Sequence, residues 1–275
     1  MSGASSTGLT DVLDALAVPR RGVVYVQSST DWLARAGYSA AESLAALRDW
    51  TSDGTLVMPS YPFFSTHLEY LQSRPVFDLR RTPVAIGLLP EMLRRTAGAV
   101  RSPDPDFCVA AIGHEAASIA GAAAAGPDPF GGDSSYQRML DSGATLVGLG
   151  VSLNTNSFIH LVDSRAGSSY PAPVYDRRVF PTTVIDASGA SRDVLRHALR
   201  PAFQQRTSPS AIVAAMTPSA AQFSTLERDG ARFFRWELDA WARWCLAHAR
   251  LQSARGEWPC WLSALASEPE LLRLG

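Results

Sequence analysis

The sequence predicts an α/β fold in which helices flank a mixed central sheet. Two observations support this prediction. Short continuous apolar runs, typical of buried strands, alternate with segments of helical periodicity, and several helical segments follow capping residues. The chain has 275 residues, 46% of them hydrophobic, so it can bury about three quarters of its unfolded surface in one large domain. The Ser-, Pro- and Gly-rich stretch 165–178 is the candidate seam between two lobes.

The first half of the chain is predicted to alternate between helix and strand. The clearest helix signal is Ser39-Ala40-Ala41-Glu42, a capping box that opens a helix to Trp50. Ser134 or Ser135 is expected to cap another helix to Leu140. The remaining elements are helices at 10–17, 87–95 and 114–120, strands at 23–26, 55–58 and 107–112, and a strand in the segment that begins at Gly143.

Two connections in this half are predicted as loops. Residues 60–83 form a long aromatic segment, and connections of that length inside compact domains tend to be functional when ordered. The second loop covers residues 126–135. In the other half we expect a strand near 182–185, a helix around 192–203, a strand at 211–216 and a Trp-rich helix at 233–251. Trp236, Trp241 and Trp244 are expected in the core or on the face of a homodimer.

Charge and cysteine content exclude several classes of protein. The 25 basic and 26 acidic residues leave a net charge of −1 without a run of like charge, which argues against nucleic acid and membrane surfaces as partners. The three cysteines have no CxxC spacing and leave an odd thiol, which favours a reducing compartment and no metal. The N-terminus lacks the pattern of a signal peptide, and no segment reaches the roughly eighteen apolar residues of a membrane span. We therefore expect a cytoplasmic protein.

The strongest candidate for catalysis is the pair His160 and Asp163. They follow an apolar strand and a polar loop, which is where α/β enzymes place a base. At positions i and i+3 of a helix they share one face, so the carboxylate can orient the imidazole. The alternative is that the two residues only cap and stabilise a helix.

Four motifs, in order along the chain, resemble the aminoglycoside N3-acetyltransferase family. They are Val24–Ser29 (VYVQSS), Gly54–Tyr61 (GTLVMPSY), Arg101–Pro105 with Ala110–Gly113, and Asn156–Asp163 (NSFIHLVD). The resemblance implies that fold and an acetyl-CoA-dependent enzyme that acylates an amine of an amino sugar in a sequential complex. It also implies the absence of a metal and of a covalent acyl-enzyme.

The chain departs from the family pattern at several motif positions. Gln27 replaces a His, Asp104 a His or Asn, Cys108 a Ser, Ser157 a Thr and Asp163 a Glu. The segment 131–135 (GGDSS) replaces the family's Gly-Glu-Gly-Ser-Pro. CoA chemistry is therefore better supported than recognition of an aminoglycoside.

We assign the remaining motif residues to two subsites. The acyl-CoA subsite takes Gln27, Ser28, Ser29, Thr30, Arg101, Ser102, Cys108 and Ser157. The serines and threonine could instead cap a helix, and Cys108 is expected to be an inert core thiol rather than an acyl carrier. The substrate subsite takes Tyr61, Phe64, His67, Asp104 and Asp133, although the aromatic segment could equally be a buried lid.

The predicted function is acyl transfer from acetyl-CoA, or another acyl-CoA, to an amine of an amino sugar, with His160 as the general base. The preferred acceptor is a nucleotide-linked or glycan-bound amino sugar. The alternatives are an aminoglycoside 3-N-acetyltransferase of antibiotic resistance, a silent member that only binds a ligand, and a hydrolase or covalent acyltransferase using Cys108 or Ser28. His114 is a weaker base candidate, and His197 and His248 are expected on helix surfaces.

Overall fold

Seven strands form the central sheet of the computed structural model, in the order β4-β5-β2-β1-β6-β10-β9. The structure describes residues 8–121, 123–217, 219, 222–268 and 270. Strands β2, β1 and β6 run parallel, whereas each neighbouring pair outside them is antiparallel: β2–β5, β5–β4, β6–β10 and β10–β9. The predicted mixed sheet is thus confirmed. The strands are β1 (Gly22–Ser28), β2 (Gly54–Pro59), β4 (Val100–Arg101), β5 (Val109–Gly113), β6 (Thr145–Leu149), β9 (Phe223–Arg228) and β10 (Ala231–Glu237).

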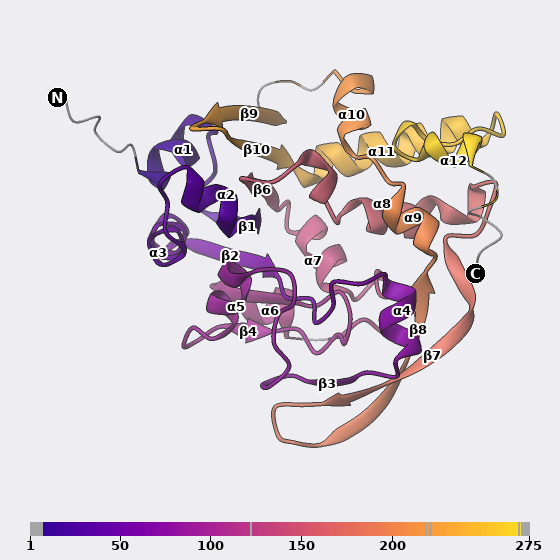
Figure 1. Cartoon of the computed structure of the whole chain (residues 1–275), viewed down its shortest axis with the longest axis horizontal. Helices are drawn as coiled ribbons and strands as arrows, with labels where there is room; N and C mark the ends of the chain where they lie inside the picture. Colours follow the sequence, from indigo (N-terminus) through magenta and orange to yellow (C-terminus); the bar gives the residue numbers. More distant parts are fainter. Residues whose placement is uncertain (1–7, 122, 218, 220–221, 269, 271–275) are drawn as a thin grey trace.

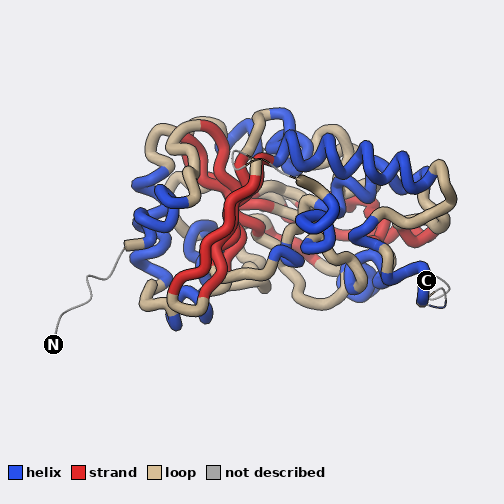
Figure 2. Tube along the Cα trace, turned by 90° about the horizontal axis from the view of Figure 1, so that it is seen from above, coloured by secondary structure: helices blue, strands red, loops and turns tan. Residues whose placement is uncertain are grey.

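Helices cover both faces of this sheet, as Figure 2 shows from above. Alternate residues of β1 enter different cores: Val23 and Tyr25 face one cluster, and Val24 and Val26 face the other. The helices are α1 (Leu9–Ala15), α2 (Thr30–Arg35), α3 (Ala40–Trp50), α4 (His67–Gln72), α5 (Leu88–Arg94), α6 (Ala116–Ala120), α7 (Ser135–Asp141), α8 (Ile159–Ala166), α9 (Pro201–Gln205), α10 (Ser210–Ala215), α11 (Leu238–Ser253) and α12 (Ala264–Ser267). Single 3₁₀ turns are η1 (Leu153–Thr155), η2 (Gly167–Ser169) and η3 (Cys260–Leu262).

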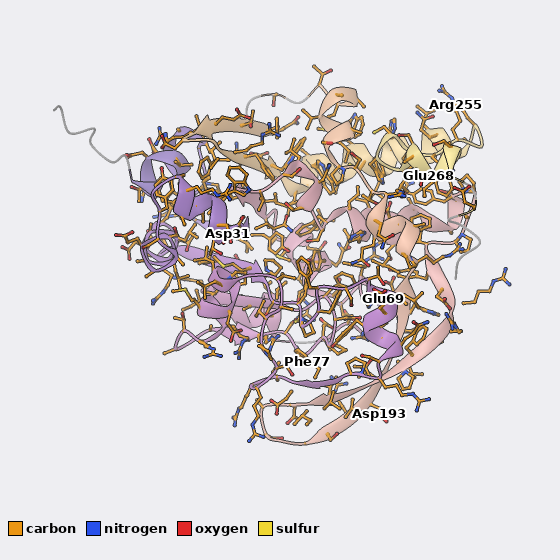
Figure 3. All side chains as sticks on the ribbon, in the orientation of Figure 1. Asp31, Glu69, Phe77, Asp193, Arg255 and Glu268 are labelled. Carbon is orange, nitrogen blue, oxygen red and sulfur yellow. The ribbon has the colours of Figure 1, made fainter. Side chains whose placement is uncertain are left out.

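A second, three-stranded sheet lies beside the main body. It consists of β3 (Val76–Asp78), β7 (Tyr175–Ile185) and β8 (Ser191–Leu199), in the order β3-β7-β8. Figure 1 shows the long β7–β8 hairpin extending below the body, with β3 beside it. Phe77 of β3, labelled in Figure 3, is fully buried. The passage from α8 to β7 coincides with the stretch 165–178, whose role as a lobe seam stays a prediction.

Most elements of the first half form as predicted. The capping box at Ser39 opens α3, and Ser134 caps α7 through the Gln137 amide. The segment 60–83 is not a loop throughout, because it contains α4 and β3. Helix α4 begins with a second capping box, formed by Thr66 and Glu69. Ser29 caps helix α2, in agreement with the alternative that the serines and threonine after the first strand cap a helix. Residues 1–7 of the N-terminal segment lie outside the described residues.

Three predictions for the second half are wrong. The segment 192–203 forms β8 and the short helix α9 rather than one helix, and 211–216 forms helix α10 rather than a strand. Short apolar runs suit both structures, and pairing with β7 decides the case of β8. The Trp-rich segment splits into β10 and α11 at Glu237, and β9 was missed. Within the described segments, no helix has the length and apolar character of a membrane span.

Candidate active site

Helix α8 carries His160 and Asp163 on one face, as the spacing predicts. The helix follows β6 and the turn η1, and Asn156 Oδ1 accepts a hydrogen bond from the Phe158 amide at its start. His160 Nδ1 lies 4.0 Å from Asp163 Oδ2, which is beyond hydrogen-bonding distance. The two groups are aligned but must approach each other before they can share a proton.

Asp163 is buried and held from one side. Its Oδ1 accepts hydrogen bonds from the Tyr170 hydroxyl at 3.0 Å and from Trp261 Nε1 at 2.9 Å. Its Oδ2 has no partner among the described residues and is the oxygen nearest to His160. Burial raises the pKa of Asp163 to about 7, and the two hydrogen bonds oppose that rise. Near neutral pH this carboxyl group can therefore exist in either protonation state.

His160 is a neutral imidazole with limited access to solvent. Its side chain is 11% exposed, and Nδ1 is buried without a hydrogen-bond partner among the described residues. Nε2 is therefore the nitrogen left to face the exposed side of the ring. Burial lowers the pKa of His160 to about 4, with a smaller contribution from His67. The ring lies beside Phe107 and Phe130, each with its centroid 6.2 Å away. At neutral pH the uncharged His160 ring therefore has a nitrogen lone pair that can accept a proton.

A cluster of buried hydroxyl groups lies at the start of the same helix. Ser157 Oγ accepts hydrogen bonds from Gln27 Nε2 at 2.8 Å and from the Tyr136 hydroxyl at 3.2 Å, and it lies 3.3 Å from the Tyr25 hydroxyl. The Tyr61 hydroxyl bonds to that of Tyr136. Burial raises the pKa of Tyr25 to about 12, so the cluster donates and accepts hydrogen bonds without carrying charge. Gln27, Ser157 and Tyr61 are thus brought together as predicted site residues.

Several buried polar atoms around β1 and α8 have no partner among the described residues. Buried polar groups in folded proteins are nearly always hydrogen-bonded, so an orphaned group indicates a bound water or ligand, or a functional role. Two of these atoms belong to side chains at the end of β1, namely Gln27 Oε1 and Ser28 Oγ. The other three belong to the segment that contains α8, namely Asn156 Nδ2, His160 Nδ1 and Asp163 Oδ2. The set contains both hydrogen-bond donors and hydrogen-bond acceptors.

The residues after β1 cap helix α2, and Trp32 of that helix lines a cavity. Ser29 Oγ accepts a hydrogen bond from the Trp32 amide, and Thr30 is the first residue of α2; both side chains are partly exposed. Beyond them lies a cavity of about 260 Å³ lined by Trp32, Gly150, Val151, Ser152, Glu227, Gly230 and Arg232. Gly150 has a φ of +66°, and a Cβ there would approach Trp32 Cβ to 2.8 Å, so only glycine fits at this point of the wall.

Arg101, Ser102 and Cys108 do not face this region. The Arg101 guanidinium donates to the carbonyls of Thr82 and Ser60 and lies 4.6 Å above the Phe77 ring. Ser102 Oγ accepts from the Val109 amide. These contacts do not support the placement of Arg101 and Ser102 in the acyl-CoA subsite, because both terminal nitrogens of Arg101 and the Ser102 hydroxyl bond to protein backbone.

Cys108 has the surroundings of an inert core thiol. It is fully buried, its Sγ donates to the Ser60 carbonyl at 2.7 Å, and it packs against Phe77 and Val184. Burial raises the pKa of this thiol to about 11. The favoured expectation for Cys108 therefore agrees with the structure, whereas a role in binding CoA or carrying an acyl group does not.

His67 and Asp104 belong to a buried polar network rather than to a substrate pocket. His67 Nδ1 accepts from the Leu199 amide, so Nε2 carries the proton and donates to Asp106 at 3.2 Å. Arg196 Nη2 donates to Asp104 Oδ1 at 2.9 Å. Burial raises the pKa of Asp104 to about 7, although Arg196 opposes the rise. No side chain of this network is more than a few per cent exposed, which corrects His67 and Asp104 as contacts of an acceptor.

The other candidates for the substrate subsite differ widely in solvent exposure. Phe64 is 86% exposed and Asp133 is exposed as well, whereas Tyr61 is buried within the hydroxyl cluster. Of the other histidines, His114 is exposed, His197 lies on β8 rather than on a helix, and His248 of α11 stacks on Trp244. Sequence reasoning missed Tyr25, Tyr136, Tyr170 and Trp261, because no spacing links these residues to His160.

The fold and the candidate site define a class of α/β protein in which a helix after a central parallel strand carries a histidine–carboxylate pair. A family model described as aminoglycoside 3-N-acetyltransferase matches residues 25–234. The chain therefore belongs to this family, which confirms the resemblance seen in its motifs.

Individual relatives agree with this membership. Aminoglycoside N(3)-acetyltransferase VII of Streptomyces paromomycinus is 33% identical over 137 residues, which is 45% of this chain and 47% of that protein. The chain thus matches about half the length of that relative. Among solved structures, aminoglycoside acetyltransferase AAC(3)-IIb has a TM-score of 0.69 at 22% identity, covering 89% of this chain and 96% of its own. AAC-IIIb in a binary complex with CoASH has a TM-score of 0.68 at 19% identity, covering 89% and 95%. At these identities the two structures establish the fold.

Proposed function

We propose that this protein is a CoA-dependent N-acyltransferase that acylates an amine of an amino sugar, with His160 as the general base. The observation that carries the proposal is the pair on α8. A neutral imidazole keeps one nitrogen accessible, while its other nitrogen faces a buried carboxylate 4.0 Å away. This is the arrangement that a base needs if it is to gain a proton and then bear a transient positive charge.

The chemistry follows from the two nitrogens of the ring. The substrate ammonium first releases one proton to solvent, which leaves a neutral amine with a lone pair. As this nitrogen attacks the carbonyl carbon of the thioester and the C–N bond forms, His160 Nε2 accepts the second N–H proton, and the C–S bond then breaks to release CoA as a thiolate. The departing thiolate is protonated by the imidazolium, which restores the neutral ring. Asp163 stabilises the imidazolium through Nδ1–H once the pair closes.

The acyl-CoA subsite is assigned to the region between the end of β1 and the start of α8. The pantetheine arm carries amide groups that match the orphaned Gln27 Oε1, Ser28 Oγ and Asn156 Nδ2. Ser157 lies three residues before His160, and in this proposal its hydroxyl group lies near the thioester carbonyl of the acyl-CoA. A solved relative of the same fold binds CoASH, which supports CoA as the co-substrate.

The acceptor is proposed to be an amino sugar with few other ammonium groups, such as a nucleotide-linked or glycan-bound sugar. An aminoglycoside carries several ammonium groups and favours a pocket rich in carboxylates. Of the four candidate carboxylates, Asp104, Asp106 and Asp163 are buried and bonded inside the protein, and Asp133 is exposed. These residues therefore offer little charge to a polycation.

Aminoglycoside 3-N-acetylation is the second candidate. The identity of 33% to aminoglycoside N(3)-acetyltransferase VII favours it, although that match covers less than half of either chain.

The test compares the wild-type protein with His160→Ala on a panel of acceptors. The panel holds acetyl-CoA constant and offers glucosamine, a UDP-linked amino sugar and paromomycin, with acetylated products measured by mass spectrometry. We expect the wild-type protein to acetylate glucosamine or the UDP-linked amino sugar. We expect the rate of His160→Ala to be lower by about 100-fold or more, which is the usual effect of losing a general base. His114→Ala changes an exposed histidine and serves as the matched control. A near-normal rate for His160→Ala would remove the assigned base, and acetylation of paromomycin alone would favour the second candidate.

A further inference from the structure

We propose that Tyr170 and Trp261 are positioning residues that set the orientation and charge of the carboxylate paired with the base. This inference rests on the proposed function, since it concerns the same histidine. Both residues donate a hydrogen bond to the same oxygen, Asp163 Oδ1, at 3.0 and 2.9 Å. The second oxygen is thereby left to face His160 Nδ1.

Two donors on one oxygen restrict rotation of the carboxylate. At any angle short of a half turn, which exchanges the two equivalent oxygens, rotation of Asp163 about its Cβ–Cγ bond would break both hydrogen bonds and leave two buried donors without a partner. The carboxylate is therefore fixed with Oδ2 toward the imidazole. The orientation of the carboxylate therefore decides whether the 4.0 Å gap between Asp163 Oδ2 and His160 Nδ1 can close.

The two donors come from the part of the chain that follows α8. Tyr170 lies directly after η2, and Trp261 lies in η3, beyond the 25–234 match to the family model. Helix α11 packs against α8, and Figure 1 shows α11 beside it. Trp261 is fully buried, with its ring 5.8 Å from that of His248, and Tyr170 stacks on Phe203. The part of the chain after α8 thus packs beside His160 and Asp163 and supplies both hydrogen-bond donors to Asp163.

The donors also determine the charge of the carboxylate. Burial favours the protonated form of Asp163, and the hydrogen bonds from Trp261 and Tyr170 oppose it by favouring the ionised form. Losing either donor raises the pKa of Asp163 further. The ionised carboxylate that stabilises an imidazolium is then present only at higher pH.

The experiment removes one donor atom at a time. Trp261→Phe deletes the indole N–H, and Tyr170→Phe deletes only a hydroxyl. We expect each variant to lower kcat by about 10-fold, since each loses a hydrogen bond to a charged group. We also expect an unchanged KM for acetyl-CoA and a shift of the acidic limb of the kcat profile to higher pH. Trp258→Phe is the matched control, because Trp258 packs against Tyr170 and Phe203 and has no bond to Asp163 among the described contacts.

Two further measurements separate positioning from folding. In an Asp163→Asn background the same substitutions should have no additional effect on kcat or on the pH profile. The ¹⁵N resonances of His160, assigned by comparison with His160→Gln, should report an altered titration in both single variants. If Trp261→Phe and Tyr170→Phe keep the wild-type kcat, limb and titration while His160→Ala is inactive, the inference fails and the proposed base stands. If His160→Ala is active, the proposed function itself fails.

Discussion

Two neighbouring residues on α8 have pKa values displaced in opposite directions by the same burial. Burial disfavours charge, so it lowers the pKa of His160 to about 4 and raises that of Asp163 to about 7. The effects on stability also oppose each other. The unfolded chain binds the additional proton on His160 between pH 4 and 6.5, so that contribution to stability is lost as the pH falls through this window. The folded chain binds the additional proton on Asp163, and that contribution is lost as the pH rises from 3.8 to about 7.

This opposition predicts the pH dependence of the rate. If the ionised Asp163 stabilises the imidazolium, kcat should fall below a pH of about 7, although the imidazole itself stays neutral down to about 4. Asp163→Asn should remove this limb and leave a plateau that is about 10-fold or more lower. Steady-state kinetics between pH 5 and 9 measures both. A wild-type kcat that stays constant from pH 9 down to pH 5 would show that the carboxylate contributes no charge to the step.

Strands β6 and β10 illustrate how one glycine permits an element to join the sheet. Gly148 pairs with Phe234 across the two antiparallel strands. A Cβ at position 148 would lie 2.1 Å from the Phe234 ring, which is itself fully buried. The absence of a side chain therefore lets the ring cover β6, and β6 in turn leads to the loop that positions α8.

Gly148→Ala should destabilise the protein by about 1–3 kcal/mol, because the added methyl group overpacks a rigid ring. Chemical denaturation followed by circular dichroism measures the change in the free energy of unfolding. Gly132→Ala is the control, since a Cβ at position 132 meets no atom within 4 Å. Equal stability of the two variants would mean that Phe234 can move aside without cost.

At the scale of the whole molecule, Arg196 connects the small sheet to the main body. It lies on β8, donates to Asp104 Oδ1 at 2.9 Å, and places its Nε 3.4 Å from Asp106 Oδ2, which also pairs with His67 of α4. All four side chains are buried. The β7–β8 hairpin is thus attached to the main body by Arg196, which pairs with two buried aspartates. A homodimer and a cytoplasmic location stay predictions.

Arg196→Ala should destabilise the fold by about 3–5 kcal/mol, because it leaves two buried carboxyl groups without their cation. Hydrogen exchange should increase most in β7 and β8. Arg192→Ala on the same strand is the control, because Arg192 is exposed. A thermal unfolding curve that is unchanged by Arg196→Ala would contradict the anchoring role.

The sequence alone determined the alternation of elements, the mixed sheet, the family and the spacing of His160 and Asp163. These features depend on local periodicity, capping residues and motifs, each of which is contained in a short stretch of sequence. The same information could not distinguish helix from strand in 192–203 and 211–216, where apolar residues suit both and pairing with β7 decided the outcome for β8.

Only the tertiary structure decided which polar residues are accessible and which are engaged. Arg101, His67 and Asp104 carry the chemistry of binding residues, yet folding buries them against carbonyls, amides and opposite charges. Conversely, Tyr170 and Trp261 gain their place beside Asp163 from packing of the chain after α8. A residue's chemistry is local, but its exposure and its partners depend on contacts between segments far apart in sequence.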